Sequence, residues 1–211
     1  MTTMSGKRES ILDLENFLII QEEESMGATY GVGLLGHLPA DMPEKVKIEV
    51  MHSFAVESRV DIPIREVISG RVAEWNPVRE SDDGGFEYEM RWLDEAEAEP
   101  ILTFARQEQH FAPYSQFSFL DGWQVFIPGA TCPRKPIRLP LPNQESTKLR
   151  INTLREGIAG MDGINRKIKR YKDDFWEGES YTCDEYTAFH TGIGNALRQC
   201  RKHQLIYVIG D

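Results

Sequence analysis

The stretch EVISGRVAEW, residues 66–75, together with GFEYEMRWLD, residues 85–94, decides the fold. Apolar and polar residues alternate in both segments, and a polar loop that ends at Gly85 separates them. A period of two is typical of a strand with one buried face. We therefore predict hairpin strands here, with alternate side chains from Phe86 to Trp92 on one face of the sheet.

Strand-like patterns extend this predicted sheet in both directions. From residue 46 to residue 64 the even positions are mainly apolar, which predicts two strands or one long bent strand. ILTFARQEQHF, residues 101–111, predicts a further strand of the same sheet. Residues 115–128 contain Asp-Gly between apolar runs, which predicts a hairpin with a type I′ turn. We therefore expect residues 27–127 to form an antiparallel, partly barrel-like sheet.

Helical spacing is found at both ends of the chain. Residues 10–25 carry an apolar stripe with Ser10 as an N-cap, which predicts an N-terminal helix. Apolar stripes from Ile164 to Phe175 and from Tyr186 to Cys200 predict two amphipathic helices, and a shorter helix is expected over residues 149–158. LIYVIGD, residues 205–211, predicts a strand that ties the helices to the sheet. The predicted fold class is α+β.

Proline and charge divide the chain into parts. Five prolines between residues 128 and 142 predict an extended connector, so we expect a mainly β region over 1–127, a connector over 128–145 and a helical region over 146–211. The net charge is -10, but residues 1–147 hold 25 acidic and 13 basic residues, whereas residues 148–211 hold 9 and 11. This acidity argues against nonspecific binding of nucleic acid or anionic membrane by the β region.

The strand pattern of residues 67–111, with SGRVAEW, a polar loop, YEMRWLD and a third strand, resembles the bent hairpins of Tudor-like and SH3-like small barrels. The resemblance implies an aromatic surface beside acidic residues, which would bind a cationic peptide or a protein with a basic surface, with methyl-lysine recognition as the most specific version. The residues assigned to this surface are Trp75, Tyr88, Trp92, Phe104, Asp94 and Glu95. The alternative is that the rings form the core, where strand aromatics usually lie.

The leading hypothesis is therefore a non-catalytic accessory protein of the adaptor, immunity or inhibitor type. A nucleic-acid-associated protein is the second hypothesis, because RKIKRYKDD, residues 166–174, places five basic residues beside a tyrosine on one predicted helix. These residues are Arg166, Lys167, Lys169, Arg170 and Lys172. A charged helix face in contact with solvent explains the same pattern.

A cysteine-dependent enzyme is the third hypothesis. Cys132 lies beside Arg134 and Lys135, whose positive charge favours the thiolate, but the spacing of the chain identifies neither a base nor an orienting group. The same loop contains a PxxP match over residues 133–136, which is typical of SH3 ligands and also of plain linkers.

Other motifs point to no cofactor or metal. GVGLLG, residues 31–36, matches GxGxxG, but Pro39 and Pro43 follow and the downstream pattern is that of a strand, so we expect a glycine-rich loop or strand edge. The five histidines are isolated from one another and the three cysteines are widely spaced, which favours neither a metal site nor a disulfide framework. We expect a cytoplasmic protein without a membrane span, and the sequence leaves the oligomeric state open.

Overall fold

The computed structural model describes residues 29–35, 41–80, 82, 84–107, 110–111, 124–131, 136–139, 147–170 and 183–210. These residues form helices and two sheets, which agrees with the predicted α+β class. In chain order the elements are β1 (Thr29–Val32), α2 (Glu44–Ser58), β2 (Ile64–Ile68), β3 (Arg71–Glu80), β4 (Phe86–Trp92), α3 (Glu95–Gln107), β5 (His110–Phe111), β6 (Gln124–Ile127), β7 (Ile137–Leu139), β8 (Thr147–Thr153), α4 (Leu154–Arg170), α5 (Cys183–His203) and β9 (Tyr207–Gly210).

The smaller sheet consists of β2, β3 and β4 in antiparallel order, which confirms the hairpin strands predicted from residues 66–94. Ile64 lies opposite Trp75, and Trp75 lies opposite Met90, so one face of the sheet is apolar. Ser69 and Gly70 join β2 to β3 with positive φ angles of 52° and 76°. Such angles give the turn the twist that an antiparallel pair needs.

The larger sheet has the strand order β5-β1-β9-β6-β8-β7. The predicted strand at residues 205–211 is confirmed as β9, which lies between β1 and β6 and pairs antiparallel with both. β6 and β8 pair in parallel, and β8 lies outside residues 27–127, to which the predicted antiparallel sheet is confined. The described residues form two open sheets and no closed barrel, so the barrel-like part of the prediction is wrong.

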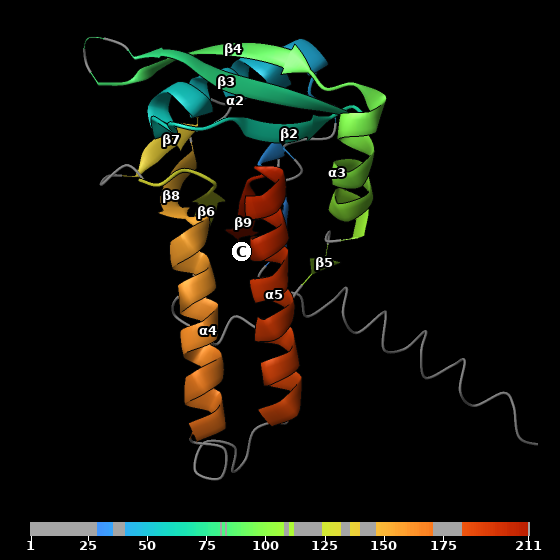
Figure 1. The fold of residues 1–211 in the computed structure, drawn as a ribbon, viewed down its shortest axis with the longest axis vertical. Helices are drawn as coiled ribbons and strands as arrows, with labels where there is room; N and C mark the ends of the chain where they lie inside the picture. The colour runs from blue at the N-terminus through green and yellow to red at the C-terminus, as the bar shows by residue number, and fades with distance from the viewer. Residues whose placement is uncertain are drawn as a thin grey trace, which may run out of the picture.

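Two hydrophobic clusters fill the spaces between these layers. The first joins the apolar face of the small sheet, including Trp75, to Phe54 of α2 and to one face of the large sheet, including Val208. The second lies on the other face of the large sheet, where α4 and α5 pack with Tyr207. Figure 1 shows α4 and α5 as two long helices that run side by side in opposite directions, away from the small sheet. No described helix is long and apolar enough to cross a bilayer.

The predicted strand over residues 46–64 is wrong, because α2 occupies most of it. The buried residues of α2 follow helical spacing, whereas Val56, at an even position, is 41% exposed. Pro43 precedes the helix, and Arg59 ends it in the left-handed conformation. Residues 46–64 therefore fit both patterns. Over a few helical turns, several positions of an apolar stripe with period 3.6 also fall on the even positions of a strand with period 2.

Two further boundaries differ from prediction because short capping motifs start helices. Residues 101–107 belong to α3 and not to a strand, and Asp94 accepts a hydrogen bond from the Glu97 N–H at 2.9 Å. The predicted helix over residues 149–158 begins only at Leu154, after β8, where the Glu156 N–H donates to Thr153 Oγ1 at 3.1 Å. Both are reciprocal capping arrangements, which satisfy backbone N–H groups at a helix start.

Other predictions are confirmed or fall outside the described residues. The two amphipathic helices are confirmed as α4 and α5, although residues 171–182 are not described. The predicted N-terminal helix over 10–25, the first strand of the Asp-Gly hairpin and the PxxP loop with Cys132 lie outside the described residues.

Candidate functional site

Acidic and aromatic side chains lie on opposite faces of β4. Residues 86, 88, 90 and 92 pack against the first hydrophobic cluster, and the alternate residues Glu87, Glu89 and Arg91 are exposed. Since side chains in a strand alternate between faces, the rings of β4 cannot share a surface with the acids of β4. The predicted combination of rings and neighbouring acids is therefore divided between the core and the exterior.

Trp75 and Tyr88 belong to the core. Trp75 is 0% exposed, and its indole Nε1 is buried without a hydrogen-bond partner among the described residues. Tyr88 is 7% exposed, and its hydroxyl donates to the Val60 carbonyl oxygen at 2.6 Å. Burial raises the pKa of Tyr88 to about 12. Neither ring is available to an external ligand in this structure.

Trp92 and Phe104 lie in different layers and already contact polar groups of the same chain. The Arg71 guanidinium lies 3.8 Å from the centre of the Trp92 ring and also pairs with Glu44 at 2.9 Å. Phe104, on α3, stacks with His203 at a ring separation of 5.9 Å. The structure therefore does not bring the four predicted rings together as one open pocket.

The predicted acidic residues form part of an exposed surface at one end of the molecule. Asp94 and Glu95 begin α3, and the outward residues of β4 continue from them. We define the acidic surface as Glu87, Glu89, Asp94, Glu95, Glu97 and Glu99. Within the described part of the chain, Glu87, Glu89 and Glu95 make no ion pair, although Arg79 lies opposite Glu87 in the register of β3 and β4.

A buried charge network supports this surface. Glu74, whose side chain is 4% exposed, accepts hydrogen bonds from Arg65 Nε at 2.6 Å and from Arg91 Nε at 2.8 Å. Asn76 donates to the same carboxylate at 3.0 Å. Burial raises the pKa of Glu74, but these hydrogen bonds outweigh it and lower the pKa below its usual value. Arg91 also binds both oxygens of Glu97, so β4 is tied to the start of α3.

Sequence reasoning missed a second buried carboxyl group, Glu66 of β2, which is 1% exposed. Its Oε2 accepts a hydrogen bond from the Leu34 N–H at 2.7 Å and a longer one from Leu35 at 3.5 Å. Its Oε1 accepts from the Val67 N–H at 3.1 Å. Burial raises the pKa of Glu66 to about 7, because the three backbone hydrogen bonds offset only part of the cost of burying a charge.

The turn that holds Glu66 is the GVGLLG motif. Gly33 has a φ of +93°, and a Cβ at this position would overlap Glu66 Oε1, so both the backbone angle and the contact require glycine. Residues 31–35 thus form the end of β1 and a turn around a carboxyl group, in agreement with the predicted strand edge. Glu66 shares its strand parity with Ile64 and Ile68, and an acidic residue at an apolar position is the signal that could have identified it.

A cavity of about 170 Å³ adjoins Glu66, between the end of β1, the β2–β3 turn and the last turns of α3. Its described lining is mainly aliphatic: Val32, Val67, Leu102 and Ala105. Arg106 and Gly70, both exposed, complete the lining. Glu66 and Arg106 are the charged groups among the described residues of this cavity.

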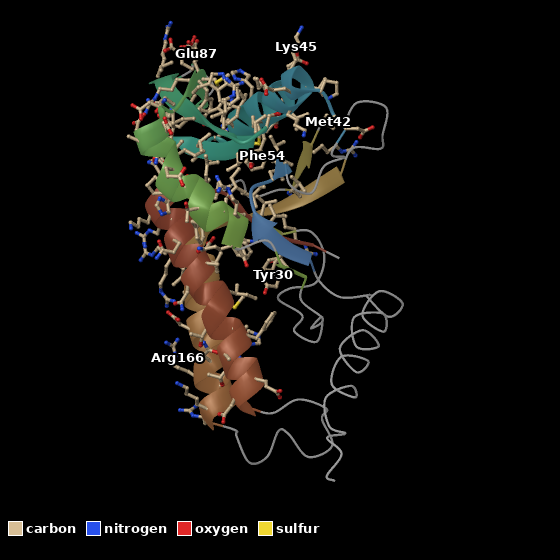
Figure 2. All side chains as sticks on the ribbon, turned by 90° about the vertical axis from the view of Figure 1, so that its right-hand side faces the viewer. Tyr30, Met42, Lys45, Phe54, Glu87 and Arg166 are labelled. Atoms are coloured by element: carbon tan, nitrogen blue, oxygen red, sulfur yellow. The ribbon has the colours of Figure 1, made fainter. Side chains whose placement is uncertain are left out.

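The basic candidates lie far from both features. Arg166, Lys167, Lys169 and Arg170 are exposed in the last part of α4, and Lys172 lies outside the described residues. Figure 2 places Arg166 toward one end of the long axis and Glu87 at the other. The positive and negative candidate surfaces therefore occupy opposite ends of the molecule.

Metal-ligating side chains and cysteines are the last candidates to place in the structure. Among the described residues, no three His, Cys, Asp or Glu side chains converge as a metal site. Cys200 is buried in the second hydrophobic cluster, and Cys183 begins α5. No protein-family model, curated protein or solved structure matches this chain.

Proposed function

We propose that this protein is a non-catalytic accessory protein that engages a partner with a basic surface through the acidic surface. The observation that carries the proposal is the row of exposed acids on β4 and at the start of α3, of which Glu87, Glu89 and Glu95 make no ion pair among the described residues. Such a concentration of one charge accelerates encounter with an oppositely charged partner and aligns it. An adaptor, immunity or inhibitor protein would work in this way.

The frame beneath the acidic surface supports the proposal. Arg91 joins Glu74 to Glu97, which links β4 to the start of α3 before any partner binds. A surface that is ordered in advance loses less conformational entropy on binding. Val78, at the bulge of β3 close to Glu87, is 50% exposed and offers an apolar contact beside the acids.

Carbodiimide cross-linking tests this proposal, because the reagent couples carboxylates directly to lysines of a bound partner. At low salt we expect cross-links at Glu87, Glu89 and Glu95, and weaker coupling at high salt because salt screens the attraction. The double variant Glu87→Lys/Glu89→Lys should lose the partner. Glu57→Lys on α2, which reverses another exposed acid, is the matched control.

Retention of the partner by the double variant, or the absence of any cross-linked partner at low salt, would refute the proposal. Thermal unfolding of both variants confirms that they fold. Equal loss in the Glu57→Lys variant would show that net charge and not this surface is responsible.

A second candidate function, nucleic-acid association, rests on the four exposed basic residues in the last part of α4. Replacing all four by Gln should reduce both the affinity for nucleic acid and its dependence on salt, by roughly 0.9 logarithmic units of slope per lost phosphate contact. Arg201→Gln/Lys202→Gln, which alters the other end of the helical pair, is the control. Unchanged binding in the quadruple variant, or none at low salt, excludes this candidate.

The cysteine-dependent alternative stays a prediction, because Cys132 lies outside the described residues. Labelling with a thiol-reactive probe across pH tests it. An ordinary cysteine titration would remove its basis.

A further inference from the structure

The cavity beside Glu66 has the dimensions of a small-ligand site. A cavity of about 150 Å³ in another protein binds benzene, so the 170 Å³ found here holds a molecule of a few non-hydrogen atoms. The aliphatic lining suits a short hydrocarbon body. Gly70 and Arg106 are exposed, so the cavity borders the protein surface on that side.

Glu66 lacks the partner that a buried carboxyl group normally has. Its oxygens accept backbone N–H groups, and no Lys, Arg or His side chain of the described residues pairs with it. Buried charges are usually paired with a counter-charge. A carboxylate oxygen accepts more than one hydrogen bond, so Oε1, which accepts one from the described residues, retains capacity for another. A ligand cation would supply the missing charge.

Arg106 supplies the opposite sign at the cavity opening. It is exposed and makes no ion pair within the described part of the chain. A guanidinium binds a carboxylate through parallel hydrogen bonds. The cavity thus presents an acceptor at its buried side and a donor at its open side.

We propose that this cavity binds a small aliphatic zwitterion, a free amino acid of about the size of alanine, with its ammonium group on Glu66 and its carboxylate on Arg106. The aliphatic wall contacts the methyl group. This site is independent of the acidic surface, so it stands whether or not that surface binds a partner.

Calorimetric titration of the full chain with four probes tests the proposal. L-alanine carries both charges, ethylamine lacks the carboxylate, propionate lacks the ammonium group, and L-phenylalanine exceeds the cavity. We expect saturable binding of L-alanine and at least about tenfold weaker binding of the two singly charged probes, since each loses one charged hydrogen-bonding group. L-phenylalanine should not bind.

Equal binding of alanine and propionate, or no saturation by alanine up to about 10 mM, would overturn the proposal, because a few-atom ligand in a matched site reaches millimolar affinity.

Variants separate the site from general stability. Arg106→Gln alters an exposed side chain and should weaken alanine binding about tenfold. Arg155→Gln, which changes an exposed arginine of α4, should leave it unchanged. Glu66→Gln keeps the size of the side chain and should abolish binding. If Glu66→Gln fails to fold, the Arg106→Gln result decides, and undiminished binding in that variant refutes the assignment.

Discussion

Glu66 and Glu74 lie on neighbouring strands of the same small sheet and both have little contact with solvent, yet their environments have opposite electrostatic effects. Glu74 faces the outer side, where Arg65 and Arg91 bind it and lower its pKa. Glu66 faces the other side, where backbone N–H groups are its described partners and burial raises its pKa. Burial raises the pKa of both carboxyl groups, and it prevails at Glu66. At Glu74 the hydrogen bonds from Asn76, Arg65 and Arg91 outweigh it.

The largest expected effect concerns the pH dependence of stability at Glu66. Its pKa is about 7 in the native state against 4.5 as the ordinary value, so between these pH values the native protein keeps a proton that the unfolded chain has lost. Stability should fall as pH rises through this interval, by about 3 kcal/mol at most. Urea denaturation from pH 4.5 to 8 measures this change. Among the described residues that line the cavity, Arg106 is the charged side chain that neighbours Glu66.

Glu66→Gln should remove most of this slope, since the amide does not titrate. Glu74→Gln is the opposing control: its lowered native pKa gives stability that is present above the ordinary carboxyl pKa and is lost as pH falls through the native value. An unchanged slope between pH 4.5 and 7 in the Glu66→Gln variant would contradict the assignment.

The next effect concerns the turn around Glu66. Gly33→Ala places a methyl group against Glu66 Oε1 and at a positive φ, and should destabilise the protein by about 2 kcal/mol. Gly192→Ala is a matched control, because a Cβ there meets nothing within 4 Å inside α5. That control should stabilise the protein by roughly 1 kcal/mol. Equal effects of both substitutions on the urea midpoint would show that the turn does not need glycine.

A smaller loss is expected at the paired carboxylate. Arg65→Met removes one of the two arginines from Glu74 and should destabilise the protein by about 1.5 kcal/mol at pH 7, because Arg91 and Asn76 remain. The loss should shrink when Glu74→Gln is already present. A double-mutant cycle measures this coupling, and independent effects would show that the pair adds nothing.

The smallest effect should follow Glu97→Gln. Both Glu97 and Arg91 are solvent-exposed, and exposed ion pairs are screened by water and salt. We expect a lower urea midpoint at low salt than in the original protein, and no difference at high salt. A loss larger than that of Arg65→Met would reverse the ranking of buried and exposed pairs.

Local patterns of the sequence were sufficient for part of the fold. The strands of residues 66–94 follow from alternation and turn residues, and α5 follows from one long apolar stripe. The segment of α2 was assigned to strands because alternation and helical spacing overlap in it. The start of α3 was missed although Asp94 and Glu97 carry a capping motif.

The candidate sites depended more on tertiary contacts. Asp94 and Glu95 are exposed, as an acidic surface requires. Trp75 is buried instead, because its face of the small sheet packs against α2. The Glu66 cavity arises from β1, β2 and α3, and its key contact joins residues about thirty positions apart along the chain. The spacing of apolar residues within one segment cannot predict a contact between distant segments. The sequence indicates this site only through Glu66, an acid at an apolar position of a strand.

The order of the strands in the large sheet has a consequence for the folding of the chain. β9 is the last of the described strands along the chain, yet it lies between β1 and β6. During synthesis β2, β3 and β4 can pair soon after they emerge, since they are neighbours in the chain. The large sheet must wait for residues 207–210, and until then β1 and β6 expose unpaired edges, which favour association with other chains.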